Sequence, residues 1–239
     1  MGSDKLLNAG LSYMACQIKF AKNGGLKGKS VPQPFVTISR QAGAGGLTIG
    51  NALIDYLQKN DKLARCAWTL FDRTLVEVFL QEHHLPQQFE KYMTEDKQSQ
   101  LQAFFEELFD LHPSEWALVH KMSETIYHLA EMGNVLIVGR GANMITRKMP
   151  YGVHVRLTGS LAQRIKHIQA YAKMNHDGAE EFVRKEDKGR RAYLRDHFGE
   201  DIDNPLLYDL VINTDQINYQ EAACLIGNLV LRRRECPRA

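Results

Sequence analysis

A glycine-rich segment near residue 45 has the residue types needed to bind a phosphate group. It contains Gly43-Ala44-Gly45-Gly46, between an apolar run and a helical pattern. Glycine lets the backbone come close to an anion, and a following helix directs its first N–H groups at the phosphate oxygens. We therefore interpret this segment as a phosphate-binding loop, with a tight turn that binds no ligand as the alternative. The loop residues are Gly43, Ala44, Gly45, Gly46, Leu47 and Thr48.

The loop departs from the usual pattern, G-x-x-x-x-G-K-[ST], because it has no lysine. Aligning Gly43-Ala44-Gly45 with the core of such loops puts Gly46 at the lysine position and Leu47 at the Mg²⁺-binding hydroxyl. Sliding by one residue puts Thr48 at the hydroxyl position, and Thr48 is our candidate metal ligand. Phosphoryl transfer relies on positioned cations. Arg40 is the nearest candidate in the sequence, and a solvated loop arginine is the alternative.

Two more charged residues follow predicted strands. Arg140 lies in Gly139-Arg140-Gly141, directly after the apolar run at residues 135–138. Ligands in open α/β sheets bind at the carboxyl ends of strands, where an arginine can fork onto a phosphate; a structural ion pair is the alternative. Asp72 also follows a predicted strand. It could hold Mg²⁺ through water, contact the acceptor or take its proton, or it could cap the next helix.

A charged segment at about residues 173–205 is predicted to form an exposed arm. It contains Arg184, Asp187 and Arg190, and few apolar positions. A mobile arm with arginines can close over a nucleotide, exclude water and neutralise charge on the transferred phosphoryl group. A solvated helix is the alternative.

The elements that must position these residues alternate between strand and helix. Apolar runs predict five strands, at residues 35–39, 67–71, 135–138, 153–157 and 210–213. The stretch 72–132 has an almost wholly helical pattern, which predicts a helical insertion. Five short strands separated by helices predict an α/β fold with a parallel sheet covered on both faces.

The first 34 residues are interpreted as an extension outside the catalytic unit of residues 35–239. Apolar residues at helical spacing predict a helix over about residues 4–22, followed by a Gly/Lys/Pro linker. The apolar stripe of this helix could pack on the core or on another subunit, as in a homo-oligomer.

Composition restricts the partners and the compartment. The formal net charge is +2 over 239 residues, so no global field demands nucleic acid or a membrane surface. There is no apolar run of about 18 residues and no secretory signal pattern. The four cysteines form no close pair in the sequence, so neither a disulfide framework nor a zinc site is expected. Scattered free cysteines fit a reducing, cytoplasmic location.

An ordered set of segments resembles one protein family. The segments are VTISRQAGAGGLTIG, VLIVGRGANMI, residues 155–168, EDKGRRAYLRDHFG and YDLVINTD. Together they resemble the cytidylate-kinase-like family over about residues 34–231. The resemblance implies a three-layer P-loop NTPase fold with a nucleoside-monophosphate-binding insertion at 72–132 and an arginine-bearing lid. The implied reaction transfers the γ-phosphoryl group of ATP, with Mg²⁺, to CMP or dCMP.

The resemblance also implies roles for individual residues. The loop from Gly43 to Thr48 would wrap the ATP phosphates, and Arg140 would contact the acceptor phosphate. Asp187 and Arg190 match the lid motif D-x-x-R, and Arg184 is a looser lid candidate.

This sequence differs from the family pattern at three places. The loop lysine is absent, and Leu47-Thr48 stands where members often have Arg-Glu. Gly141 replaces an aspartate of cytidylate kinases that contacts cytosine or ribose. Besides a CMP or dCMP kinase, three alternatives therefore stay open. They are a kinase of another small molecule, a nucleotide-binding sensor or scaffold with little turnover, and an oligomerising protein whose loop binds inorganic anions.

Overall fold

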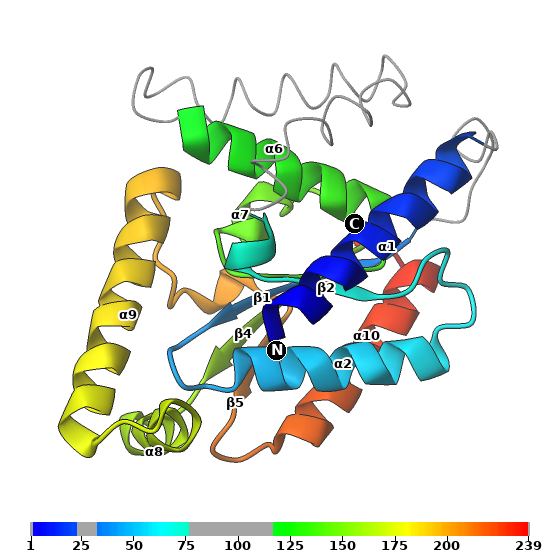
Figure 1. The fold of residues 1–239 in the computed structure, drawn as a ribbon. Coiled ribbons are helices and arrows are strands. Elements are labelled where there is room, and N and C mark those ends of the chain that lie inside the picture. Colours follow the sequence, from blue (N-terminus) through cyan, green and yellow to red (C-terminus); the bar gives the residue numbers. More distant parts are fainter. Residues whose placement is uncertain (1, 23–32, 77–116, 239) are drawn as a thin grey trace.

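A parallel sheet forms the centre of the molecule, which is a computed structural model describing residues 2–22, 33–76 and 117–238. The strands within these ranges pair in the order β2-β3-β1-β4-β5 (Figure 1). Their bounds are β1 Phe35–Arg40, β2 Thr69–Phe71, β3 Val135–Val138, β4 Gly152–Thr158 and β5 Leu210–Asn213. All neighbouring strands run parallel. This confirms the predicted α/β class with its five-stranded parallel sheet.

The strand sequences explain this arrangement. A strand that is covered on both faces is apolar throughout, and every residue of β3 is buried. β1 lies between β3 and β4, where Val36 pairs with Leu136 on one side and Val153 on the other. The central position of β1 places its last residue, Arg40, in the middle of the carboxyl edge of the sheet.

Helices cover both faces of the sheet and form two apolar cores (Figure 1). On one face, α2 (Gly46–Asn60) and α10 (Tyr219–Glu235) pack together through buried residues such as Leu53 and Ile226. On the other face lie α6 (Ala117–Met132) and the short α7 (Ala142–Ile145). The two cores fix the strand ends from which the candidate site residues project.

The N-terminal helix α1 (Gly2–Lys22) packs on the sheet core rather than standing apart. Tyr13 and Met14 are buried, and the Tyr13 hydroxyl donates a hydrogen bond to the Gly133 carbonyl at 2.7 Å. Of the two predicted partners for the apolar stripe, the core is therefore the one that the structure shows. The division into an extension and a catalytic unit stays an interpretation.

The expectation that all cysteines are free was wrong. Cys16 of α1 and Cys66, just before β2, form a disulfide, whereas Cys224 and Cys236 are free and exposed. Residue spacing did not indicate this pair, because the two cysteines are 50 residues apart and meet only when α1 packs beside β2.

Two helices stand at the carboxyl edge of the sheet, where the sequence predicted a lid. They are α8 (Leu161–Ala172) and α9 (His176–Phe198), followed by a 3-10 turn, Pro205–Leu207. Ser160 caps α8 by accepting a hydrogen bond from the Gln163 N–H, and Asn175 caps α9. Figure 1 shows α9 standing beside the strand ends.

The predicted helical insertion at 72–132 falls largely on residues 77–116, outside the described ranges. Its described parts, residues 73–76 and α6, are helical. No helix within the described ranges has the length and apolar character required to cross a bilayer. The same ranges contain no cluster of three or more His, Cys, Asp or Glu side chains arranged to hold a metal ion.

Candidate active site

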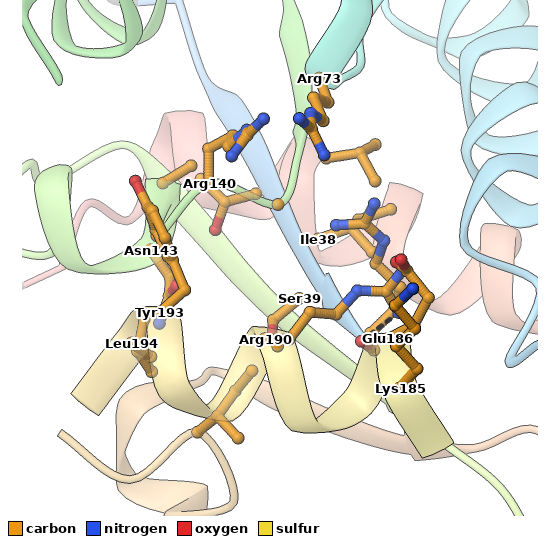
Figure 2. Close-up of a pocket in the computed structure, with 18 residues that line it drawn as sticks. Ile38, Ser39, Arg73, Arg140, Asn143, Lys185, Glu186, Arg190, Tyr193 and Leu194 are labelled. Atoms are coloured by element: carbon orange, nitrogen blue, oxygen red, sulfur yellow. Dashed lines mark hydrogen bonds and ion pairs between the residues drawn. The ribbon is translucent and has the colours of Figure 1, made fainter. Parts of the chain in front are cut away.

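A cavity of about 390 Å³ lies at the carboxyl edge of the sheet (Figure 2). The end of β1, the loop between β3 and α7, and one face of α9 form its wall. Five of its lining residues carry positive charge: Arg40, Arg73, Arg140, Lys185 and Arg190. Such a cavity has the electrostatic character of an anion site.

Arg40 is the last residue of β1, and its side chain crosses from the glycine loop to the loop after β3. A Cβ atom at Gly46 would lie 3.1 Å from Arg40 Cγ, and one at Gly139 would overlap with Nη1. Burial, followed by the positive charge of Arg190, lowers the pKa of Arg40 to about 10. The guanidinium therefore stays charged at neutral pH.

Arg140 enters the cavity from a loop with an unusual backbone. Gly139, Arg140 and Gly141 all have positive φ, at 90°, 58° and 65°. Such angles are strained for a residue with a side chain, so glycine on both sides makes the turn easier to form. The Arg140 guanidinium lies 6.0 Å from the ring centroid of Tyr193 on α9.

Arg190 comes to the same cavity from α9. Its guanidinium pairs with Glu186 at 2.9 Å and donates to the Arg40 carbonyl at 3.4 Å. Burial lowers the pKa of Arg190, although Glu186 and Asp187 oppose this effect. Figure 2 shows Arg140 and Arg190 on opposite walls of the cavity. The structure thus brings together the three predicted arginines from three separate segments.

The glycine loop adopts the expected strand–loop–helix position but does not line this cavity. Gly43 and Gly45 have positive φ, at 80° and 76°. A Cβ at Gly43 would overlap with the Arg164 carbonyl, and one at Gly45 would lie 2.7 Å from the Tyr219 ring. One side of the loop is therefore packed against α8 and α10.

The helix that follows the loop begins without a side-chain cap. Gly45 occupies the N-cap position of α2 and offers no side-chain acceptor. The first N–H groups of a helix have no partner within the helix. Leu47 and Thr48 lie on this first turn and are exposed. The start of α2 therefore offers N–H groups to a phosphate, and Thr48 offers the hydroxyl.

Asp187 fixes α9 to the glycine loop. Its Oδ1 accepts a hydrogen bond from the Ala42 N–H at 2.7 Å, and its Oδ2 pairs with Arg164 at 2.7 Å. Arg164 also donates to the Ala42 carbonyl at 3.0 Å. The side chains of Arg164 and Asp187 are only 8% and 11% exposed, so this buried contact sets the distance between α9 and the glycine loop.

Asp72 and Arg184 lie outside the cavity wall. Asp72 Oδ1 accepts a hydrogen bond from the Leu75 N–H at 2.9 Å, as the capping alternative predicted. Arg184 pairs with Glu180 one turn earlier on α9, and its side chain is 62% exposed. Arg184 is not brought together with Arg40, Arg140 and Arg190, whereas the negative charge of Asp72 lies near enough to Arg40 to raise its pKa against the effect of burial. The predicted roles of Asp72 and Arg184 stay predictions.

Several lining residues were missed by the sequence analysis, namely Arg73, Asn143, Lys185, Glu186 and Tyr193. The direction in which each faces depends on how α9 and the β3 loop cross the sheet, which residue spacing does not reveal. Position next to a predicted site residue was the only signal: Arg73 follows Asp72, and Lys185 precedes the lid motif.

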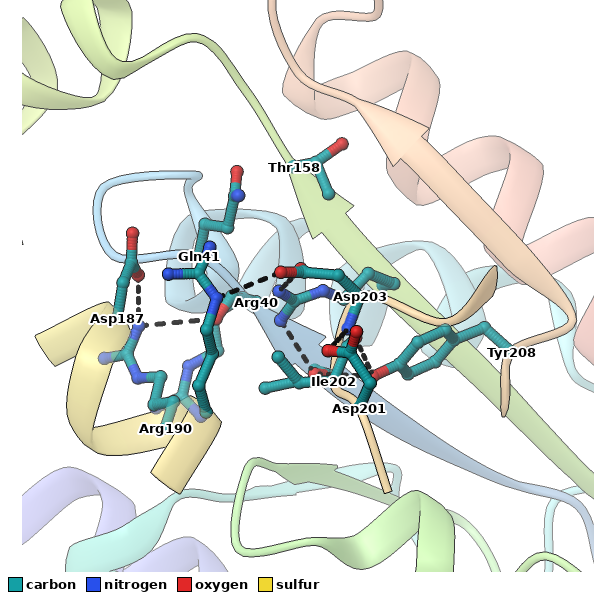
Figure 3. A network of polar contacts seen from close by, with 12 residues as sticks. Arg40, Gln41, Thr158, Asp187, Arg190, Asp201, Ile202, Asp203 and Tyr208 are labelled. Carbon is teal, nitrogen blue, oxygen red and sulfur yellow. Dashed lines mark hydrogen bonds and ion pairs between the residues drawn. The ribbon is translucent and has the colours of Figure 1, made fainter. Parts of the chain in front are cut away.

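A second polar network joins the end of β1 to α9 and to the segment that follows α9 (Figure 3). Buried Arg156 of β4 donates to Ser39 at 3.0 Å and pairs with Asp203 at 2.8 Å. Asp203 also pairs with Arg191 of α9 at 3.0 Å. Hydrogen bonds from Arg156 and Arg191 lower the pKa of Asp203, although its burial acts in the opposite direction. The network connects α9 with the strand that carries Arg40.

The loop after β3 leaves no room for a side chain at position 141. A Cβ at Gly141 would overlap with the ring of Phe198, the last residue of α9. The ring therefore fills the space into which an aspartate at this position would extend.

Comparisons with known proteins agree with this geometry. The model of a family described as cytidylate kinase-like matches residues 35–216. An uncharacterised protein from Eubacterium ventriosum ATCC 27560 has a similar structure, with a TM-score of 0.63 and 17% identity over 84% of this chain and 99% of its own. Because the identity is low, this likeness concerns the fold.

Other solved structures are more distant. The shikimate kinase from Acinetobacter baumannii in complex with shikimate matches with a TM-score of 0.45 and 16% identity, over 89% of this chain and 97% of its own. The shikimate kinase from Bacteroides thetaiotaomicron gives a TM-score of 0.41 and 16% identity, over 84% of this chain and 96% of its own. No curated protein matches the chain.

Proposed function

This chain belongs to the cytidylate kinase-like family, and we propose that it transfers the γ-phosphoryl group of ATP to a small acceptor that itself carries a phosphate. The observation that carries this proposal is the convergence of Arg40, Arg140 and Arg190 on one cavity. Guanidinium groups bind phosphate oxygens in pairs and neutralise the charge that develops during phosphoryl transfer.

The charges around the cavity favour a phosphate oxygen as the acceptor atom. A hydroxyl acceptor loses a proton during transfer and needs a base. Among the described lining residues Glu186 is the one carboxylate, and it is paired with Arg190 at 2.9 Å. A phosphate ester is largely ionised at neutral pH, so it needs no base. Nucleoside monophosphates fit this chemistry, and we keep CMP and dCMP as the leading acceptors because of the family.

The identity of the base is a separate matter. Gly141 stands where cytidylate kinases have an aspartate, and Phe198 occupies the adjacent space. Recognition of cytosine or ribose would therefore come from other residues of this chain. Another nucleoside monophosphate, or another phosphorylated small molecule, is the alternative acceptor.

Each group of site residues would have its own role in the reaction. Arg140 would hold the acceptor phosphate while Arg40 and Arg190 neutralise the transferred group. The loop and the first N–H groups of α2 would bind the donor phosphates. The bond between the γ-phosphorus and the bridging oxygen breaks, ADP leaves, and the acceptor oxygen takes the phosphoryl group. The lid helix α9 would exclude water from this exchange.

Mg²⁺ fits this site as a partner of the donor phosphates. Mg²⁺ commonly keeps several waters and uses few protein ligands besides substrate phosphates. Thr48, exposed at the start of α2, supplies the hydroxyl on the protein side. When bound, the ion adds positive charge to the phosphate chain.

A nucleotide sensor or scaffold is the second candidate function. Two observations favour it: the loop lacks the lysine, and α8 and α10 pack against one side of the loop. In that case ATP binds and no acceptor yields product.

Location and partners complete the proposal. We place the reaction in the cytoplasm, with a nucleotide as partner and neither nucleic acid nor membrane. The Cys16–Cys66 disulfide is the observation that fits a reducing compartment least well. A homo-oligomer through α1 is still open, although Tyr13 and Met14 of that helix are buried in this chain's own core.

The direct test is ADP release with ATP, Mg²⁺ and a panel of phosphate-bearing and hydroxyl-bearing acceptors. We expect release with at least one nucleoside monophosphate and none with acceptors that offer only hydroxyls. Arg140→Ala should lower kcat/KM at least about 100-fold without changing the melting temperature, whereas the exposed control Arg232→Ala should match the wild type. Confirmed ATP binding without product across the panel would favour the sensor.

A further inference from the structure

The glycine loop departs from the phosphate-loop pattern at two positions, and the two departures complement each other. Placing G-x-x-x-x-G-K so that its second glycine falls on Gly45 puts Arg40 at the first glycine and Gly46 at the lysine. Where the pattern has a glycine, this chain has a cation; where the pattern has the cation, this chain has a glycine.

The structure brings these two positions into contact. A Cβ at Gly46 would lie 3.1 Å from Cγ of Arg40, and 3.5 Å from its Cβ and Cδ. The aliphatic part of Arg40 therefore lies across the point where a lysine side chain at position 46 would begin. A side chain at position 46 would be in tight contact with that of Arg40, which would have to move by a few tenths of an ångström to admit it.

The charged end of Arg40 reaches the loop that carries Arg140. Its Nη1 occupies the space next to Gly139 that a Cβ there would fill, and Gly139 has a φ of 90°. Arg40 thus lies between the first turn of α2, which the proposed function assigns to the donor phosphates, and the loop of Arg140, which it assigns to the acceptor. A group at this junction can contact the phosphoryl group while it passes from one to the other.

We propose that Arg40 and Gly46 have exchanged roles, so that the Arg40 guanidinium supplies from the end of β1 the positive charge that a loop lysine supplies from the first turn of the helix. This inference rests on the proposed function and deepens it. A guanidinium presents a planar fork that binds two phosphate oxygens at once, whereas a lysine is a point charge. Packing of Nη1 against Gly139 keeps the fork in place, and the hydrogen bond that Arg190 donates to the Arg40 carbonyl at 3.4 Å fixes the backbone beneath it.

The exchange can be reversed by mutation. The variants are Arg40→Ala, the conservative Arg40→Lys, the double variant Arg40→Gly/Gly46→Lys, and the exposed control Arg232→Ala. Each is compared with the wild type by its Kd for Mg-ATP in titration calorimetry, by ADP release and by its melting temperature.

Arg40→Ala should weaken ATP binding about 10- to 100-fold, because a charge-assisted hydrogen-bonded contact is lost. Its turnover should fall about 1,000-fold. Arg40→Lys should lie in between. The double variant restores the usual pattern, and its Kd for Mg-ATP should be at least about ten-fold lower than that of Arg40→Ala. Arg232→Ala should match the wild type.

The outcomes separate this inference from the proposed function. If Arg40→Ala binds ATP and turns over like the wild type, while Arg140→Ala is inactive, the exchange is refuted and the kinase proposal stands. If the wild type releases no ADP with any acceptor, the kinase proposal fails, and the ATP affinities still decide the role of Arg40. If Arg40→Ala does not fold, the test uses Arg40→Lys and the double variant instead. A double variant that folds but binds ATP no better than Arg40→Lys contradicts the exchange.

Discussion

Arginine side chains gather at the carboxyl edge of the sheet because β1 and β3 each deliver one to it. Arg40 ends β1, and Arg140 follows β3 by two residues. Both could be identified from the sequence, since a polar residue directly after a buried parallel strand faces that edge. Arg164 could not be identified in this way, because its role depends on how α8 crosses the loop.

His154 illustrates a buried residue that couples the sheet to pH. Its Nδ1 shares a hydrogen bond with the Thr37 hydroxyl at 2.8 Å, and its ring is buried. Burial, and then the positive charge of Arg238, lowers the pKa of His154 to about 4. The folded protein therefore keeps this imidazole neutral.

The stability of the protein should consequently fall as the pH drops from 7 to 5. In this range the unfolded chain binds a proton on His154, with an unperturbed pKa of about 6.5, and the folded chain does not. The loss should be on the order of 1 to 2 kcal/mol. Urea unfolding at both pH values measures it, and His154→Asn, which cannot titrate, should lose less. An equal loss in both proteins would show that other groups are responsible.

At the scale of elements, the sequence predicted the strands well and their connections less well. β3 and β5 have the predicted bounds, residues 135–138 and 210–213. β2 begins at Thr69 rather than residue 67, because β3, its one neighbour among the described strands, begins at Val135 and offers no earlier pairing. Helix contacts were harder: α1 carries an apolar stripe, but nothing in its sequence states which surface it covers.

The disulfide between α1 and the segment before β2 should contribute to stability. Its cysteines are 50 residues apart. A crosslink over such a stretch reduces the conformational freedom of the unfolded chain, and so raises the free energy of unfolding by about 2 to 4 kcal/mol. Reduction, or Cys16→Ser/Cys66→Ser, should lower the free energy of unfolding by this amount. Denaturant unfolding with and without reductant measures the change.

Alkylation gives an independent check of the same pair. In denaturant without reductant, only Cys224 and Cys236 should react, as the free cysteines; reduction should expose all four cysteines of the chain. Modification of all four without reductant would contradict the disulfide.

At the scale of the whole molecule, the two ends of the sheet have different tasks. The carboxyl edge holds the cavity with its charged lining. At the other end, Asp61 directly follows α2. Its carboxylate accepts hydrogen bonds from Arg234 of α10 at 2.8 Å and from the indole N–H of Trp68, just before β2, at 2.9 Å. These contacts hold α2, α10 and β2 together. The rigid end supports the strands, and their other ends present the site residues.

This division explains what the sequence could and could not predict about the site. Strand ends and the glycine loop are local features, so Arg40, Arg140 and the loop can be assigned from the sequence. The Asp187 contact with the Ala42 N–H joins residues 145 positions apart, and the filling of the space at Gly141 by Phe198 depends on where α9 ends. Such contacts follow from the packing of whole layers, which residue spacing does not specify.

The central claim is that one site holds donor and acceptor, with the loop amides at one end, Arg140 at the other, and Arg40 and Arg190 around the transferred group. A crystal structure with a two-substrate analogue, in which a phosphate chain links adenosine to cytidine, tests it most directly. The account predicts a chain that runs from the N–H groups of residues 43–48 past Arg40 and Arg190 to Arg140. A phosphate chain bound elsewhere, or one that leaves these three arginines without contact, would contradict it.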